Sequence, residues 1–186
     1  MALNWTMLNP NRTPVPLPRE LTILTIDSGA EVSIDIPNKP PEGSATAGGS
    51  GGAKKLKESG KVFLTDQRLI FTADGASAAF DSLSIPLHSI LATKFEQPYL
   101  GANYLAVDVK PSPDGGLTDG TKAEFRLKNQ GLFQFVSLLE KTRERALYMR
   151  RQVRDEEETL PAYASPAATS TRAAGTPTEA PPGYDA

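Results

Sequence analysis

Few residues in this sequence have the type and spacing that catalysis or metal binding requires. His88 is the only histidine, and the chain has no cysteine. No pair of carboxylates lies around His88 at ligand spacing, so neither a metal site nor a general base is expected there. Serine and aspartate residues are scattered, without the spacing of a nucleophile and its base. We therefore expect no catalytic residues, no metal and no cofactor, and we interpret the protein as a non-enzyme.

The strongest binding signal is the sequence Pro-Pro-Gly-Tyr at residues 181–184. Two adjacent prolines favour polyproline II, so Pro181 and Pro182 lose little entropy when they enter an aromatic groove. Tyr184 follows one turn along that helix, on the same side as Pro181, and can fill a neighbouring pocket. This is the ligand motif of WW domains, and we expect these three residues to form a WW-binding site.

A weaker form of the same motif, Leu-Pro-Ala-Tyr, occupies residues 160–163. Leu160 replaces the first proline, whereas Pro161 and Tyr163 are kept. Two interpretations stay open: a weaker WW ligand, or a Pro–Tyr pair that arose by chance.

Two basic runs are candidates for binding anionic ligands. Lys54, Lys55, Lys57 and Lys61 could contact phosphoinositide head groups. The alternative, which we favour, is a solvated loop. The arginines of the second run could contact DNA phosphates; they are Arg143, Arg145, Arg150, Arg151 and Arg154. Glu144 and the acidic residues 155–158 favour a compensated helix face instead, so direct sequence-specific nucleic-acid binding is not expected.

The composition indicates one domain of ordinary size together with unstructured chain. Of the 186 residues, 39% are hydrophobic, which is low for a chain that folds throughout. The net charge is −2, and residues 155–186 carry six acidic residues and one arginine, a net of −5. No run of apolar residues is long enough to span a membrane, and no signal peptide is recognisable, so we expect a cytoplasmic and nuclear protein.

Alternating apolar and polar residues predict a mainly β domain of about seven or eight short strands. A strand, a turn at residues 27–30 and a second strand are expected over residues 21–36. Residues 61–65 and 68–73 form a second predicted hairpin. The remaining predicted strands are residues 80–85, 89–96, 104–110 and 123–128. Their succession without intervening helices predicts an antiparallel barrel or sandwich.

One helix is expected after the last strand, over about residues 130–154. Asn129 is a suitable N-cap, and Leu132, Phe135, Val136 and Leu139 recur at helical spacing. Acidic residues from Asp155 onward oppose the helix dipole and are expected to end it. The predicted organisation is therefore a proline-containing segment at residues 1–18, a domain at residues 19–154 and a disordered tail at residues 155–186. A flexible Gly/Ser-rich loop is expected at residues 43–52.

GKVFLTDQRLIFTA (60–73) and FDSLSIPLHSI (80–90) are similar to the pattern of GRAM domains. The opening segment (3–20), the KFEQPYLGANYLAVDVKP segment (94–111) and the terminal PPGY narrow the resemblance. Together, and in this order, these segments resemble the WW domain-binding protein 2 family, and the long Gly/Ser-rich stretch is typical of a fungal-type member.

This resemblance implies a pleckstrin-homology-like (GRAM) antiparallel barrel of about seven strands, with one C-terminal α-helix at the end of the barrel. It also implies an adaptor whose partners are WW-containing ubiquitin ligases of the HECT type or WW-containing transcriptional regulators. A role as a transcription coactivator associated with chromatin follows from the same family. The alternative is a peripheral membrane module that binds phosphoinositides through its GRAM domain.

Overall fold

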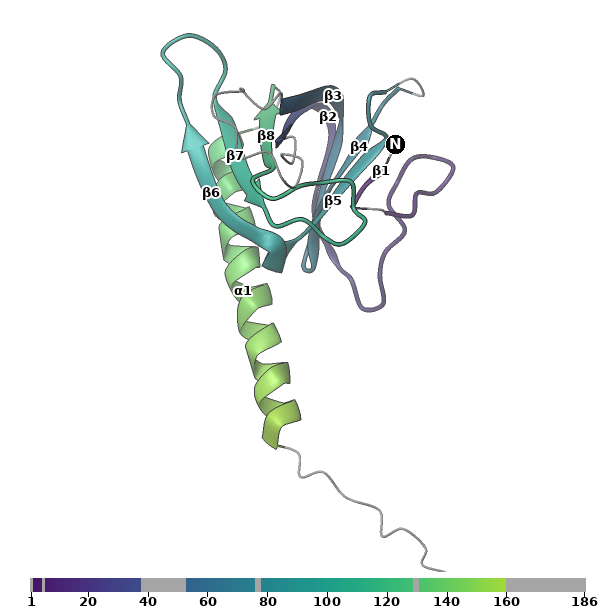
Figure 1. Ribbon diagram of the computed structural model, residues 1–186, viewed down its shortest axis with the longest axis vertical. Helices are drawn as coiled ribbons and strands as arrows, with labels where there is room; N and C mark the ends of the chain where they lie inside the picture. The colour runs from purple at the N-terminus through teal and green to yellow at the C-terminus, as the bar shows by residue number, and fades with distance from the viewer. Residues whose placement is uncertain (1, 5, 38–52, 76–77, 129–130, 160–186) are drawn as a thin grey trace, which may run out of the picture.

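The computed structural model describes residues 2–4, 6–37, 53–75, 78–128 and 131–159 (Figure 1). The predicted loop at residues 43–52, the N-cap Asn129 and everything beyond Thr159 lie outside these ranges. A mainly β domain followed by one long helix is confirmed.

All described strands belong to one eight-stranded sheet, in the order β1-β5-β4-β3-β2-β8-β7-β6. The strands are β1 (Ala2–Leu3), β2 (Thr22–Pro37), β3 (Ala53–Thr65), β4 (Arg68–Ala73), β5 (Ser82–Pro86), β6 (Ile90–Glu96), β7 (Tyr104–Val109) and β8 (Lys122–Leu127). Each pairing is antiparallel except that of β1 with β5, which is parallel. The short strand β1 was not predicted, because two residues are too few to show strand periodicity.

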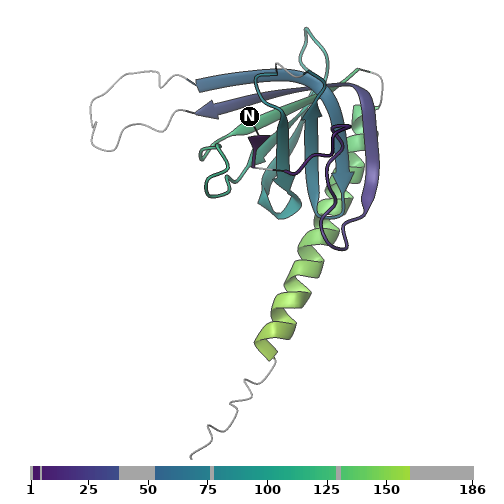
Figure 2. The ribbon, with the colours of Figure 1, turned by 90° about the vertical axis from the view of Figure 1, so that its right-hand side faces the viewer.

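Strand β2 corrects the prediction of a strand–turn–strand over residues 21–36. It is one long strand that pairs with β3 along its length, with a register shift between Ile26 and Ala30 (Figure 2). Gly29, at φ 75°, supplies a backbone conformation that suits a bulge. Only the part after this irregularity, from Ala30 to Asp35, also pairs with β8. The turn-like residues 27–30 therefore bend a strand and do not reverse the chain.

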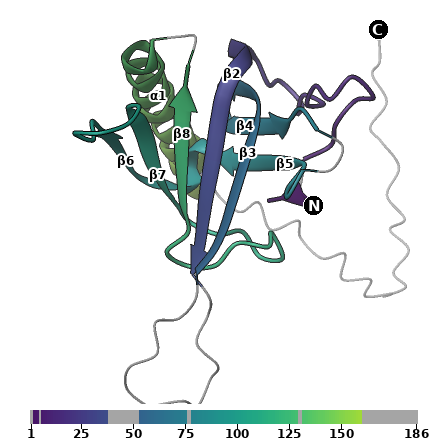
Figure 3. The same ribbon diagram turned by 90° about the horizontal axis from the view of Figure 1, so that it is seen from above.

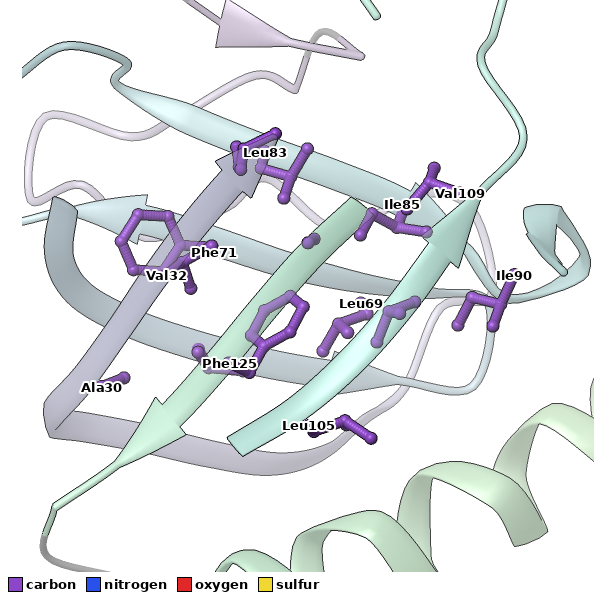
Figure 4. Packing of buried hydrophobic residues seen from close by; sticks show 14 of the residues in the cluster. Ala30, Val32, Leu69, Phe71, Leu83, Ile85, Ile90, Leu105, Val109 and Phe125 are labelled. Carbon is purple, nitrogen blue, oxygen red and sulfur yellow. The ribbon is translucent and has the colours of Figure 1, made fainter. Parts of the chain in front are cut away.

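The sheet curls around one apolar core. Along β2, Val32, Ile34 and Ile36 are buried, whereas the residues between them face outward. Figure 4 shows side chains from β2, β4, β5, β7 and β8 pointing into this shared interior, among them Phe71 and Phe125. The alternation of apolar and polar residues that predicted the strands therefore also predicts which face of the sheet is buried.

Helix α1 (Leu132–Thr159) closes one side of this core and lies beside the edge strand β6 (Figures 1 and 3). The predicted apolar positions are buried: Leu132, Phe135, Val136 and Leu139. The helix continues past the predicted end at Arg154, so the acidic residues 155–158 do not stop it.

Side chains of α1 cover the outer edge of β6. Arg143 donates hydrogen bonds to the carbonyl oxygens of Ile90 (2.9 Å) and Leu91 (3.2 Å). Thr93 donates to Glu140, and the ring of Phe133 packs edge-on against Phe95 with centroids 6.5 Å apart. An unpaired strand edge is a template for unwanted pairing, and these contacts occupy it.

Candidate binding surfaces

The residues with the strongest predicted binding role cannot be placed. Pro181, Pro182 and Tyr184 lie outside the described residues, and so do Leu160, Pro161 and Tyr163. Both WW-binding motifs stay predictions from the sequence.

The four lysines of the candidate phosphoinositide site lie on strand β3, which corrects the expectation of a loop. Successive side chains of a strand point to opposite faces. Lys55, Lys57 and Lys61 therefore share one face of β3, whereas Lys54 lies on the other face with the core residue Leu56. The structure does not bring the four ammonium groups together on one surface.

Two of these lysines form ion pairs across the β2–β3 ladder. The Nζ of Lys57 lies 2.9 Å from a carboxylate oxygen of Glu31, and that of Lys55 lies 3.5 Å from Asp35. Lys128 follows β8, which pairs with β2 on the side opposite β3. Its Nζ lies 3.6 Å from the other carboxylate oxygen of Glu31. The hydrogen bond from Lys57 holds the pKa of Glu31 below its usual value, although burial opposes this. Cross-strand carboxylates explain why lysines, which are poor strand formers, start a strand here. They offset the charge of Lys55 and Lys57, which a phosphate would need.

The arginines of the second basic run lie along α1 and have different environments. Arg143 is engaged with the β6 edge, whereas Arg145, Arg150 and Arg151 are exposed. Figures 1 and 2 show this part of the helix projecting away from the sheet. Arg145, Arg150 and Arg151 therefore lie on the exposed part of the helix, whereas Arg143 is bound to the domain body.

A buried ion pair that sequence reasoning missed joins the N-terminal segment to the β3–β4 hairpin. Arg68 and Glu20 are 48 positions apart, and their side chains are 8% and 1% exposed. The Nε of Arg68 donates to Glu20 at 2.7 Å, and a terminal nitrogen donates to the second carboxylate oxygen at 2.9 Å. Thr65 also donates to Glu20, at 2.7 Å. A two-point contact of this kind is the strong, geometrically specific form of an arginine–carboxylate pair.

The rest of the Arg68 guanidinium is bound by the N-terminal segment. It donates to the hydroxyl of Thr6 at 2.7 Å and to the carbonyl oxygen of Val15 at 2.8 Å. Arg68, Ile70 and Thr72 lie on the same face of β4, because successive side chains of a strand point to opposite faces. Ile70 and Thr72 are both buried, and Ile70 is 0% exposed. Figure 3 shows the N-terminal segment beside β4 and β5, on the side of the sheet away from α1. Residues of the predicted 1–18 segment thus cover the outer face of this hairpin.

His88 lies in a short 3-10 helix, η1 (Leu87–Ser89), between β5 and β6. Burial lowers its pKa, and the charges of Arg150 and Lys110 lower it further. Among the residues that the structure describes, no group of three acidic or imidazole side chains is placed to hold a metal ion. Nor does the described part of the chain contain a helix long and apolar enough to cross a bilayer.

A curled antiparallel sheet that ends in a packed C-terminal helix defines a PH-like fold. The Vps36 N-terminal PH domain has the same fold. It superposes with a TM-score of 0.55 at 16% identity, over 79% of this chain and 96% of that domain.

No family model matches the chain. Over 77 residues it is 34% identical to the UPF0664 stress-induced protein C29B12.11c of Schizosaccharomyces pombe, which is 41% of this chain and 44% of that protein. The match thus spans less than half the length of this curated relative. The finer resemblance to the WW domain-binding protein 2 family stays a prediction.

Proposed function

We propose that this protein is a non-enzymatic adaptor in which a PH-like domain carries a WW-domain ligand at residues 181–184. The observation that supports this is the sequence Pro181-Pro182-Gly183-Tyr184 on a chain whose folded part is a binding-domain type. The prolines are pre-set for an aromatic groove and Tyr184 supplies the pocket-filling ring.

The partners that fit this ligand are WW-containing proteins, either HECT-type ubiquitin ligases or transcriptional regulators. With partners of the second kind, the protein would act as a transcription coactivator at chromatin, recruited through its partner and not through its own contact with DNA. A cytoplasmic and nuclear location is part of the same proposal.

Titration calorimetry of the full chain with a single WW domain tests this proposal. A single motif of this size gives an affinity on the order of micromolar, about −8 kcal/mol. Tyr184→Ala should abolish most of the measurable binding, and Tyr163→Ala is the matched control that should leave it almost unchanged. Unchanged binding by Tyr184→Ala would refute the adaptor function.

Phosphoinositide binding by the PH-like domain is the alternative. The fold class is compatible with a lipid or a protein ligand, but the ion pairs of Lys55 and Lys57 with Asp35 and Glu31 count against a free basic surface. We therefore expect little binding to vesicles that contain phosphoinositides. Strong vesicle binding that Lys54→Ala and Lys57→Ala abolish, with Tyr184→Ala without effect, would favour the lipid function instead.

A further inference from the structure

Three basic side chains gather at the end of the sheet where α1 leaves the domain. His88 lies in η1, Lys110 directly follows β7, and Arg150 lies on the projecting part of α1. All three residues are exposed. Because they come from elements that are far apart in the sequence, no run of basic residues predicted this cluster.

Backbone contacts place His88 and Lys110 side by side. Strand β7 ends beside the start of β6, where Val109 pairs with Ile90. One residue further along, the backbone N–H of Lys110 donates to the carbonyl oxygen of Ser89 at 2.8 Å. Ser89 directly follows His88 in η1. The two exposed side chains therefore belong to neighbouring backbone positions at the same end of the sheet.

The helical repeat places Arg150 on the side of α1 that faces the domain. Arg143 marks this side, because it donates to the carbonyl oxygens of Ile90 and Leu91. Arg150 follows about two turns later and lies within about 20° of Arg143 around the helix axis. The buried residue Leu139 shares this side as well. Arg150 therefore lies just beyond the point where Arg143 meets β6.

The charges of the cluster act on one another. Burial lowers the pKa of His88, and the positive charges of Arg150 and Lys110 lower it further, so both cations lie close to the ring. No carboxylate is among the groups that act on His88.

Arg150 has no acidic neighbour at the positions where a helix supplies a partner to a charge. The residues three and four positions away are Ala146, Leu147, Val153 and Arg154. Among the residues that the structure describes, neither Lys110 nor Arg150 forms an ion pair. The positive charge of the cluster is therefore not offset in the described part of the chain.

Holding like charges together costs electrostatic energy, which an anion between them offsets. The protein does this with a carboxylate elsewhere, because Lys57 and Lys128 share Glu31. At His88 the donors suit a phosphate: an arginine fork that binds two oxygens, a lysine ammonium and a ring N–H. A phosphate monoester carries a charge of about −1.5 to −2 near neutral pH, so it matches this set better than one carboxylate does.

The shape of this end of the molecule favours a soluble ligand over a membrane. Figures 1 and 2 show the last turns of α1 extending past the end of the sheet. His88 and Lys110 belong to the end of the sheet, whereas Arg150 lies on the domain-facing side of the helix. The extending helix would hold a flat bilayer away from the sheet, but a small phosphate ester can reach all three side chains.

We propose that His88, Lys110 and Arg150 form a binding site for the phosphate group of a soluble phosphate monoester. The site is separate from the WW ligand at residues 181–184, so either can fail without the other.

The test uses His88 as its own reporter, because it is the only histidine of the chain. The NMR signals of its imidazole ring are followed with pH in the full chain, at equal ionic strength, in chloride, in inorganic phosphate and in O-phosphoserine. We expect both phosphates to raise the pKa of His88 above its value in chloride, because a nearby anion favours the imidazolium form. Serine added to the chloride solution is the control and should leave that pKa unchanged.

Matched variants separate a built site from general charge attraction. Arg150→Gln should weaken O-phosphoserine binding, followed at the His88 ring, about tenfold or more, and Lys110→Gln should weaken it in the same direction. Arg145→Gln removes the same charge from an exposed position about 140° around the helix from Arg150, and should weaken binding roughly twofold or less. Equal thermal unfolding of the three variants shows that the fold is kept.

Two results would overturn the proposal. The first is an equal pKa of His88 in chloride and in both phosphates, or equal effects of Arg150→Gln and Arg145→Gln, because either means that the cluster does not hold a phosphate group. The second is binding to vesicles that contain a phosphorylated lipid but not to O-phosphoserine, lost in Arg150→Gln. That result would assign the cluster to a membrane surface.

Discussion

Arg68 and Glu20 place two opposite charges where water hardly reaches either of them. Taking both charges out of water is costly, and the pair is tolerated because each remaining polar atom finds a partner. Glu20 accepts from Arg68, Thr65 and the backbone N–H of Leu17, while Arg68 also reaches Thr6 and Val15. The pair therefore fixes where the N-terminal segment lies.

Removing one partner leaves the other charge buried without compensation. We expect Arg68→Ala to lower the free energy of unfolding by about 3–5 kcal/mol. The control is Arg126→Ala, which breaks a more exposed pair with Glu124 (2.8 Å) and should cost about 1 kcal/mol or less. Urea unfolding of both variants measures the difference. Similar losses would show that Arg68 is no more important than a surface arginine.

The same pair should make stability depend on pH in the acid range. Burial raises the pKa of Glu20, but hydrogen bonds from Arg68, Leu17 and Thr65 outweigh it and hold that pKa below its usual value. A lowered carboxyl pKa contributes stability that is fully present above the unfolded value of about 4.3 and is lost as the pH falls through the folded value.

Glu20→Gln removes this dependence. Relative to the unchanged chain, we expect it to be less stable near neutral pH and to lose less stability between about pH 6 and pH 3. The two profiles should converge in acid, as measured by urea unfolding at each pH. Parallel profiles would mean that Glu20 does not titrate with a shifted pKa.

Strand β3 shows how close backbone approach constrains an element. A Cβ built on Gly60 would lie 2.0 Å from the carbonyl oxygen of Thr72 and 2.9 Å from the Cα of Ala73, both on β4. Backbone atoms of a paired strand cannot move away as a flexible side chain can. Gly60 is therefore required by the β3–β4 ladder itself.

Alanine at this position should strain the ladder. We expect Gly60→Ala to cost about 2 kcal/mol or more of unfolding free energy. Gly75→Ala is the control, because nothing lies within 4 Å of a Cβ built there, and it should change stability by about 0.5 kcal/mol or less. Thermal unfolding compares the two. A stable Gly60→Ala variant would show that β3 and β4 can separate locally.

The sequence predicted those elements whose local pattern agrees with their tertiary surroundings. Strands β4, β6, β7 and β8 and the packed half of α1 were predicted because periodicity alone selects their buried faces. The bulge in β2 was predicted as a turn because Asp27, Ser28 and Gly29 have turn chemistry. Only the pairing with β3 on both sides of these residues shows that the strand bends and continues. No local pattern links Glu20 to Arg68, so the buried pair had no signal. The lysines of the candidate site could be found in the sequence, but the β2 carboxylates that pair with Lys55 and Lys57 could not.

At the scale of the whole molecule, the fold connects three parts through one sheet. The N-terminal segment binds the outer face of β3–β4, the core lies inside the curl, and α1 leaves the domain on the opposite side (Figure 3).

The predicted domain start at residue 19 can be tested at this scale. A chain that begins at Arg19 lacks Thr6 and Val15, the two N-terminal acceptors of Arg68, and loses the cover over Ile70. We expect its free energy of unfolding to fall by about 3 kcal/mol or more, and we expect it to bind an apolar dye such as ANS when the full chain does not.

Arg12→Ala is the control for this truncation. It removes only the half-exposed contacts of the segment with Asp81 and with the carbonyl oxygen of Gly75, so the segment stays in place and stability should fall by about 1 kcal/mol or less. If the shortened chain unfolds like the full one, the domain does begin at residue 19. The contacts of Arg68 with Thr6 and Val15 would then contribute nothing to stability, and Glu20 alone would satisfy the buried guanidinium. If only the shortened chain is destabilised, the N-terminal segment is part of the domain, because a buried arginine needs acceptors that the strands of the sheet do not supply.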